Sequence, residues 1–251
     1  MKIIAIIPAR YASSRFPGKP LVDIGGKTMI QRVIEQVRLC KSIGHVVVAT
    51  DDDRIYNHVL GLGAECVMTD TKHPSGTDRC LEAFERVNSD ADCVVNVQGD
   101  EPFVDPSQLD ALCTLISQPE VSIATLAKRI SDKETLFDPS KVKVVINKYS
   151  QALYFSRQVI PFYRNADEGS WHALHSYYKH LGLYAYKPEK LKTICTLAPS
   201  PLEKAESLEQ LRWMENGHEI YVGITDIESP AIDTPEDLQN VLTRYFSSSK
   251  R

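Results

Sequence analysis

Apolar and polar segments alternate along the first half of the chain in a strand-then-helix rhythm. Residues 3–7 form a short β-branched apolar run that ends at Pro8. After a polar loop, apolar residues recur from Met29 to Cys40 at the three- and four-residue spacing of a helix. Residues 46–49 and 93–97 are further continuous apolar runs, a pattern typical of strands covered on both faces. This half therefore predicts a parallel α/β sheet flanked by helices.

The rhythm is less regular in the second half. Apolar runs predict strands at residues 121–127, 142–146, 152–155 and 221–224. Residues 161–180 are rich in aromatic and charged side chains without periodicity, which indicates an excursion from the sheet or a subunit contact. We find no internal repeat and no linker, and we predict one domain over residues 1–251, in which about residues 140–190 contribute an inserted lobe.

Two helix starts have strong local signals. Ser200 precedes Pro201, and Glu203 follows three residues after the serine, which is a capping box with proline at the first helical position. An apolar series follows, formed by Leu202, Ala205, Leu208 and Leu211. It predicts one helix that ends before Gly217, with this stripe packed inward and Glu209 and Gln210 turned off it. Thr234 opens a C-terminal helix in the same way, and residues 247–251 are expected to form a frayed tail.

Composition narrows the class of protein. Twenty-nine Lys and Arg residues stand against 33 Asp and Glu, a net charge of −4 that lacks the electropositive footprint of a nucleic-acid binder. No stretch reaches the roughly 18 apolar residues that span a bilayer, so no membrane insertion is expected. The six cysteines include no C-x-x-C pair, which favours a reducing compartment. We therefore expect a cytoplasmic protein whose partners are small molecules.

The loop after the first strand carries three cations, Arg10, Arg15 and Lys19. It stands at the carboxyl end of a strand, where open α/β sheets bind their ligands. Arginine grips phosphate oxygens with a planar fork and lysine adds a point charge, so the loop suits a polyphosphate. The motifs G-x-x-x-x-G-K-[ST] and G-x-G-x-x-G are absent, which disfavours a P-loop ATPase and a Rossmann dehydrogenase. A solvated basic loop is the alternative.

Two carboxylates are candidate metal ligands. Asp100 follows another predicted central strand, so it should project toward the same edge of the sheet as the basic loop. A carboxylate beside a triphosphate suits Mg²⁺, which prefers one or two carboxylates together with phosphate oxygens and water. Asp233 offers a second carboxylate. The alternatives are a cap on the next turn for Asp100 and an ordinary helix-leading aspartate for Asp233.

A third loop leads into a capped helix, with Ser75 as the N-cap and Asp78 three residues later. The cap explains the shape of this loop. It leaves Arg79 unexplained, and also Gly76, where the backbone could closely approach a planar base.

The order and spacing of these segments resemble the 3-deoxy-manno-octulosonate cytidylyltransferase family, the CMP-Kdo synthetases, over nearly the whole chain. The matching blocks are residues 7–21, 49–52, 75–79, 97–102, 154–157, 178–184, 206–212 and 233–237. The only variation we note is His180-Leu181-Gly182, where His-Ile-Gly is more usual.

The resemblance implies a fold of the nucleotide-diphospho-sugar transferase type, with a Rossmann-like, mixed and mostly parallel central sheet flanked by helices. It also implies a homodimer, with the middle region of the chain at the contact. The implied reaction joins CTP and 3-deoxy-D-manno-octulosonate (Kdo) to give CMP-Kdo and pyrophosphate for lipopolysaccharide biosynthesis, with Mg²⁺ as cofactor. The sugar's own anomeric hydroxyl is the nucleophile, so no nucleophilic side chain is needed.

Site residues follow from the resemblance position by position. Arg10, Arg15, Lys19, Asp100 and Asp233 are implied in catalysis, and the two aspartates are implied to hold the metal. The implied CTP site consists of Pro8, Ala9, Arg10, Ser14, Arg15, Lys19, Ser75, Gly76, Arg79, Gln98 and Asp100. The implied sugar site consists of Gln98, Arg157, His180, Tyr184, Glu209 and Gln210.

Several alternatives remain open from the residues themselves. The sugar could be an amino-substituted Kdo, a sialate or a sugar phosphate, and a non-catalytic nucleotide-binding module is the rival from another class. His180 could be a structural histidine, and Arg157 could belong to an interface ion pair.

Overall fold

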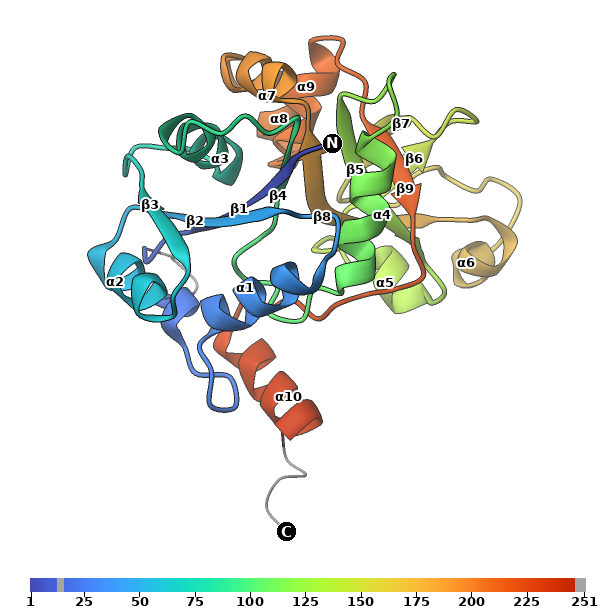
Figure 1. Ribbon diagram of the computed structural model, residues 1–251. Coiled ribbons are helices and arrows are strands. Elements are labelled where there is room, and N and C mark those ends of the chain that lie inside the picture. The colour runs from blue at the N-terminus through green and yellow to red at the C-terminus, as the bar shows by residue number, and fades with distance from the viewer. Residues whose placement is uncertain (13–15, 247–251) are drawn as a thin grey trace. The chain divides into compact units, whose positions relative to one another are not determined.

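The structure is a computed structural model that describes residues 1–12 and 16–246 (Figure 1). The chain divides into two compact units. Unit 1 contains residues 1–113 and the C-terminal segment from Ser229, and unit 2 contains Thr114–Glu228. The lobe expected at residues 140–190 lies inside unit 2. That the whole chain folds as one domain stays a prediction.

Unit 1 contains a parallel sheet of the kind the sequence predicts. Its strands are β1 (Ile3–Ala9), β2 (His45–Thr50), β3 (Glu65–Met68) and β4 (Cys93–Asn96). All three pairings are parallel, in the order β3-β2-β1-β4. β1, β2 and β4 are confirmed as buried apolar runs. β3 was missed because it is short and begins with an exposed glutamate, so it has no apolar run to mark it.

Helices cover both faces of these four strands. They are η1 (Lys19–Leu21), α1 (Met29–Leu39), α2 (Asp53–Gly61), α3 (Gly76–Arg86), α4 (Pro106–Ile116), which ends in unit 2, and α10 (Pro235–Phe246). α1 and α2 lie on one face and α3 lies on the other (Figure 1). The chain changes face because β2 and β3 extend the sheet on one side of β1, whereas β4 joins on the other side. The carboxyl ends of β1 and β4 therefore form a topological switch point, where open α/β sheets bind ligands.

Unit 2 contains a mixed set of strands. They are β5 (Ile123–Arg129), β6 (Lys143–Ile146), β7 (Ala152–Ser156), β8 (Tyr178–Tyr186) and β9 (Tyr221–Ile224). β8 pairs antiparallel with β5 and β6, β6 pairs antiparallel with β7, and β5 pairs parallel with β9. Parallel pairing throughout unit 1 and mixed pairing in unit 2 confirm the predicted α/β class.

The helices of unit 2 are short. They are α5 (Lys133–Phe137), η2 (Glu168–Ser170), α6 (Trp171–Leu174), α7 (Pro188–Cys195), α8 (Pro201–Glu206) and α9 (Gln210–Glu215). The aperiodic stretch 161–180 contains η2 and α6, and its Trp171 is buried in a small cluster with Ile130, Leu136 and Tyr177. This explains why the stretch shows no helical period.

The single helix predicted from Ser200 is wrong, although its capping box is confirmed. The chain leaves the helix at Ser207, which adopts φ 52°, and resumes as α9. Leu208 and Leu211 are buried as predicted, but Leu202 is 38% exposed and Ala205 is also exposed. The break has a tertiary cause, because the Glu206 carboxylate accepts hydrogen bonds from Ser156 Oγ at 2.7 Å and Arg157 N at 2.9 Å. These bonds fix the end of α8 against β7.

The cap at Thr234 is confirmed, since its hydroxyl accepts from Asp237 N and α10 begins at the next residue. The expected frayed tail, residues 247–251, lies outside the described residues. Over residues 1–12 and 16–246, no helix combines the length and apolar character needed to cross a membrane. All six cysteines are free thiols.

Candidate active site

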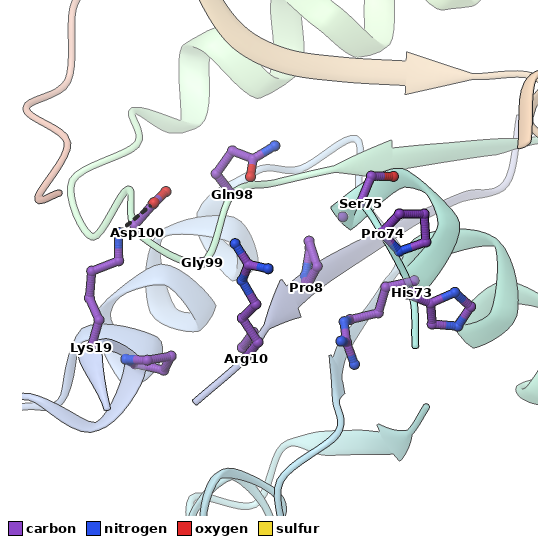
Figure 2. A pocket seen from close by; sticks show the side chains of 13 residues that line it. Pro8, Arg10, Lys19, His73, Pro74, Ser75, Gln98, Gly99 and Asp100 are labelled. Carbon is purple, nitrogen blue, oxygen red and sulfur yellow. Dashed lines mark hydrogen bonds and ion pairs between the residues drawn. The ribbon is translucent and has the colours of Figure 1, made fainter. Parts of the chain in front are cut away.

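A cleft opens at the switch point of unit 1, at the carboxyl ends of β1 and β4. The residues that line it are Pro8, Ala9, Arg10, Lys19, Pro20, His73, Pro74, Ser75, Gly76, Arg79, Gln98, Gly99 and Asp100. Figure 2 shows Lys19 and Asp100 on one side, His73, Pro74 and Ser75 on the other, and Arg10 between them. The cleft thus unites three loops that the sequence analysis picked out separately.

Close backbone contact explains why these loops meet. A Cβ atom added to Gly99 would lie 2.7 Å from the carbonyl oxygen of Pro8. Only glycine lets the loop after β4 pass this close to the end of β1. Gly99 therefore sets the floor of the cleft, where Ala9 and Gln98 are neighbours on the two loops.

Lys19 brings the two candidate metal ligands together. Its Nζ donates to Asp100 Oδ2 at 2.7 Å and to Asp233 Oδ1 at 3.2 Å. Gly18 precedes it at φ 70°, a left-handed conformation that starts η1 and turns Lys19 toward the carboxylates. The side chain of Lys19 is only 12% exposed, so little water screens these ion pairs.

Asp233 lies beside Asp100 because its segment is anchored on both sides. Ile232 N donates to the carbonyl oxygen of Asp100 at 3.1 Å, and the Ile232 side chain is buried in a cluster with Met29 and Leu238. On the other side, Asp237 Oδ2 accepts from Asp233 N at 3.0 Å. Residues 133 positions apart in the sequence thus present their carboxylates at one point.

The donor set at this point suits a hard divalent cation. Asp100 and Asp233 share the ammonium group of Lys19, so a positive charge already balances the two carboxylates at this point. No cluster of three or more His, Cys, Asp or Glu residues occurs in the described part of the chain. A site with only two carboxylates fits Mg²⁺, which keeps water and substrate phosphates among its ligands.

Of the two other cations of this loop, the structure describes Arg10. Arg10 is exposed at the end of β1, and it has no hydrogen-bond or ion-pair partner among residues 1–12 and 16–246. Its charge is thus available to a ligand. Ser14 and Arg15, both expected in the CTP site, lie outside the described residues.

The opposite wall of the cleft is the start of α3. The Ser75 hydroxyl accepts from Asp78 N, as the predicted N-cap, at 3.2 Å. Gly76 follows, and its backbone is close to Pro8 because an added Cβ would lie 3.4 Å from Pro8 Cγ. At Gly76 the wall therefore offers backbone without a side chain, at the capped N-terminal end of α3.

Arg79 lines this wall, but its guanidinium is already paired. Nη2 donates to Asp51 Oδ2 at 2.7 Å, Nη1 donates to Thr69 Oγ1, and the residue is 4% exposed. Asp51 follows β2 and Thr69 follows β3, so Arg79 ties α3 to two strand ends. This arrangement makes Arg79 a positioning residue of the cleft.

His73 is a cleft residue that the sequence analysis missed. Its Nε2 is bonded to Glu82 Oε2, and the same carboxylate accepts from Asp70 N at 2.8 Å and from Arg86 Nε at 2.6 Å. Burial opposes ionisation of Glu82, but these hydrogen bonds outweigh burial and lower its pKa to about 2. Asp51, Gly99 and Glu82 were also missed, because each acts through partners that only the fold supplies.

In unit 2, the guanidinium of Arg157 donates to backbone carbonyl oxygens and to no carboxylate of the described residues. Nε donates to the carbonyl oxygen of Glu206 at 2.7 Å, and Nη1 and Nη2 donate to the carbonyl oxygens of Pro139 and Ser207, each at 3.3 Å. No ion pair involves Arg157 in the described part of the chain. Because its partners are neutral carbonyl oxygens, the positive charge of the guanidinium is not balanced by them.

His180 and Tyr184 lie together on β8. Their rings are 5.2 Å apart, and His180 also contacts the Phe155 ring at 5.0 Å. Burial lowers the pKa of His180 to about 3 and raises the pKa of Tyr184, with Glu209 adding to the latter shift. The Tyr184 hydroxyl is buried without a hydrogen-bond partner among the described residues. A buried, unpaired phenol of this kind suits contact with a polar ligand.

Glu209 and Gln210 stand at the start of α9. Glu209 Oε1 accepts from Arg212 Nη2 at 2.9 Å, and Gln210 is buried. Tyr184 on β8 packs against Trp213 on α9 with ring centroids 5.3 Å apart, so α9 lies against β8. Unit 2 thus gathers Tyr184, His180 and Glu209. The guanidinium of Arg157 lies at the end of α8, where it donates to the carbonyl oxygen of Ser207, two residues before Glu209.

Known proteins of similar sequence define the family of this chain. Residues 4–220 match the family described as Cytidylyltransferase, a class of protein that a cleft lined by cations and a carboxylate fits. The 3-deoxy-manno-octulosonate cytidylyltransferase of Cytophaga hutchinsonii is 55% identical over 96% of this chain and 96% of that protein. The chain belongs to the 3-deoxy-manno-octulosonate cytidylyltransferase family, and the resemblance stated from the sequence is confirmed.

Two further relatives refine the comparison. The 8-amino-3,8-dideoxy-manno-octulosonate cytidylyltransferase of Shewanella piezotolerans is 46% identical over 95% of this chain and 96% of that protein. A solved structure of a CMP:2-keto-3-deoxy-manno-octonic acid synthetase complexed with CTP matches with a TM-score of 0.89 and 42% identity, over 97% of this chain and 98% of that one.

Proposed function

We propose that the protein transfers CMP from CTP to the anomeric hydroxyl of Kdo and releases pyrophosphate. The observation that carries the proposal is the convergence of Asp100 and Asp233 on Lys19 in the cleft at the switch point. The anomeric oxygen forms a bond to the α-phosphorus, and the bond from that phosphorus to the pyrophosphate breaks. Such a displacement needs positioning and charge neutralisation, and no nucleophilic side chain.

The cleft residues have complementary roles in holding CTP. Arg10, Lys19 and Arg15 bind the phosphates, and a charge-assisted hydrogen bond of this kind contributes about 1.5–3 kcal/mol. Ser75 and Gly76 accept the base and ribose at the start of α3. Arg79 keeps that wall in place through Asp51 and Thr69.

We assign Asp100 and Asp233 as the ligands of Mg²⁺. When bound, the metal neutralises the charge that develops on the reacting and leaving phosphates. The assignment predicts that Asp100→Asn leaves the fold intact and removes most turnover. Near-normal activity of this variant at limiting Mg²⁺ would contradict the assignment.

The residues of unit 2 suit a sugar acid. Arg157 presents a cation held only by carbonyl oxygens, which matches the carboxylate of Kdo. His180 and Tyr184 offer neutral polar groups, which match hydroxyls, and Glu209 adds an acceptor. Gln98, which lines the cleft of unit 1, stays a predicted sugar contact.

Pyrophosphate release from CTP tests the function directly. The enzyme is incubated with CTP and Mg²⁺, and then with Kdo, a sialate, a sugar phosphate or no sugar. The proposal expects release with Kdo and none without a sugar. Binding of CTP without release under any condition would support the non-catalytic module instead.

An amino-substituted Kdo is the second candidate substrate, because one relative is named for 8-amino-3,8-dideoxy-manno-octulosonate. Both sugars share the carboxylate and anomeric hydroxyl and differ at one end. The ratio of kcat/KM for the two sugars decides between them.

We also propose a cytoplasmic homodimer. The aromatic stretch of unit 2 supports a subunit contact, because Phe162 is 72% exposed and Leu174 is 55% exposed beside the buried Trp171. Sedimentation of the wild type and of Phe162→Ser tests it, and a monomeric wild type contradicts it.

A further inference from the structure

The hydroxyl of Thr125 contacts His180 and a backbone carbonyl at once. Thr125 Oγ1 lies 2.9 Å from His180 Nε2 and 2.7 Å from the carbonyl oxygen of Leu183. Thr125 is on β5 and fully buried, so no water competes for these bonds. Both partners lie on the neighbouring strand β8, within four residues of each other.

Counting protons assigns a direction to each bond. A threonine hydroxyl has one proton, and a carbonyl oxygen only accepts. The proton of Thr125 therefore goes to Leu183, because two oxygens 2.7 Å apart with no proton between them would repel each other. The hydroxyl oxygen then accepts from His180, which places the imidazole proton on Nε2.

Gly182 N offers the competing arrangement. It lies 3.3 Å from His180 Nε2 and would donate to that atom if Nε2 were unprotonated. If Nε2 accepted from Gly182 N, the single proton of Thr125 would have to serve two shorter contacts, one with Leu183 and one with His180. One of these two contacts would then have no proton. Both shorter contacts have a proton only when the imidazole proton is on Nε2, so we assign the Nε2–H form.

A strand irregularity creates this geometry. The register between β5 and β8 shifts between Thr125 and Ala127, and Gly182 has φ 74°, a conformation that favours glycine. The bulge folds β8 so that one hydroxyl reaches both His180 and Leu183. In a regular ladder these two residues would be spread along the strand.

His180 is also kept neutral. Burial lowers its pKa to about 3, and its ring contacts are the aromatic rings of Phe155 and Tyr184. Its Nδ1 has no hydrogen-bond partner in the described part of the chain. A neutral ring with its proton on Nε2 has a lone pair on Nδ1.

We infer that Thr125 is a positioning residue that fixes His180 as the neutral Nε2–H tautomer, so that Nδ1 accepts a hydrogen bond from a hydroxyl of the sugar acid. A lone pair at Nδ1 attracts a hydroxyl and repels a carboxylate. His180 thereby selects for hydroxyl groups and leaves the carboxylate to Arg157. The ligand half of this inference rests on the proposed function.

Nitrogen NMR of the ligand-free protein tests the tautomer without any activity measurement. Long-range ¹H–¹⁵N spectra at neutral pH show which ring nitrogen is protonated, and His180→Gln identifies the signals among the seven histidines. We expect Nε2–H in the wild type and in Thr125→Ser. In Thr125→Val we expect Nδ1–H, because Gly182 N becomes the only partner of Nε2. A wild-type Nδ1–H form overturns the inference, as does an unchanged tautomer in folded Thr125→Val.

Kinetics test the consequence for the sugar. Thr125→Val should raise the KM for Kdo about tenfold, which corresponds to one lost hydrogen bond, and Thr125→Ser should restore it. The KM for CTP should stay unchanged in both variants. Thr193→Val, which removes an exposed hydroxyl from α7, is the matched control. An equal rise for CTP indicates a structural role and overturns the inference.

The two experiments separate two kinds of failure. If the wild type has the Nε2–H form but no sugar acid supports pyrophosphate release, the proposed function is wrong and the tautomer assignment stands. If Kdo is used normally by Thr125→Val, the proposed function stands and the role of Thr125 is wrong.

Discussion

At the scale of single residues, Lys19 forms ion pairs with two carboxylates at once. Its ammonium neutralises Asp100 and Asp233 together, which keeps two like charges stable at one point. Under the proposed function, a metal bound to this pair would release Lys19 to interact with the phosphates.

Lys19→Met should lower kcat/KM for CTP about 10- to 100-fold, since one charge-assisted contact is lost, and leave the KM for Kdo unchanged. The variant should also gain more thermal stability from Mg²⁺ than the wild type, because the paired carboxylates repel each other without the ammonium. Steady-state kinetics and melting curves measure both effects. Lys27→Met, at an exposed ion pair with Glu35, is the control, and an effect confined to Kdo would move Lys19 to the sugar site.

Lys143 is a fully buried lysine that forms no ion pair with the residues that the structure describes. Its Nζ donates to the carbonyl oxygens of Asp138 at 2.9 Å, Lys141 at 2.6 Å and Arg157 at 2.5 Å. Burial lowers its pKa, while Asp138 partly offsets this. The side chain thus satisfies three backbone acceptors and holds the backbone of Arg157.

Lys143→Met should therefore destabilise the protein by about 2–4 kcal/mol, because buried carbonyls lose their donor. Urea unfolding measures the loss. Lys141→Met removes an exposed lysine two residues away and should change stability by less than about 0.5 kcal/mol. Equal stability of the two variants would mean that water replaces the ammonium.

At the scale of elements, the site depends on how closely strand ends and helix starts approach. Gly99 and Pro8 are the tightest such contact, and Ser75 and Thr234 set where α3 and α10 begin. The two caps are local in sequence, whereas the contact of Gly99 with Pro8 joins distant parts of the chain. Both kinds of feature affect the site through the packing of different elements.

Gly99→Ala should displace the loop after β4 from β1, because its Cβ would lie 2.7 Å from a backbone oxygen that has no room to move. We expect a rise in the KM for CTP and a loss of about 1–3 kcal/mol in stability. Gly61→Ala is the control, since nothing lies within 4 Å of the added Cβ and alanine favours its helix. Unchanged CTP kinetics in Gly99→Ala would show that the loop tolerates the shift.

At the scale of the whole molecule, the buried neutral His180 couples stability to pH. The unfolded chain binds a proton on this histidine below its ordinary pKa of 6.5, whereas the folded protein does not until about pH 3. The unfolding free energy should therefore decrease as pH falls below 6.5, by at most about 1.4 kcal/mol per pH unit.

Urea unfolding between pH 7.5 and pH 5.5 measures this slope. His180→Gln should flatten it, because the glutamine does not titrate. His45→Gln, at an exposed histidine, should leave the contribution of His180 in place. A slope equal in wild type and His180→Gln would show that folding leaves the pKa of His180 near its ordinary value.

The sequence by itself determined the features that are written in consecutive residues. Buried apolar runs identified β1, β2 and β4, and the capping patterns at Ser75, Ser200 and Thr234 identified helix starts, because a run or a cap depends on neighbours only a few residues away. The cations after the first strand and Asp100 after a later strand were identified as candidates because ligands bind at strand ends. The family was identified from the order of the sequence blocks.

Only the tertiary structure decided how those residues are paired. Arg79 binds Asp51 across 28 residues and Thr125 meets His180 across 55, while the bonds of Glu206 to β7 break a helix that its local pattern would continue. Hydrogen bonds and ion pairs depend on distances of a few ångströms, and residues far apart in the chain reach those distances only when the sheet and helices pack. The sequence therefore names the chemical groups of the site, and the packing sets their charge, tautomer and partners.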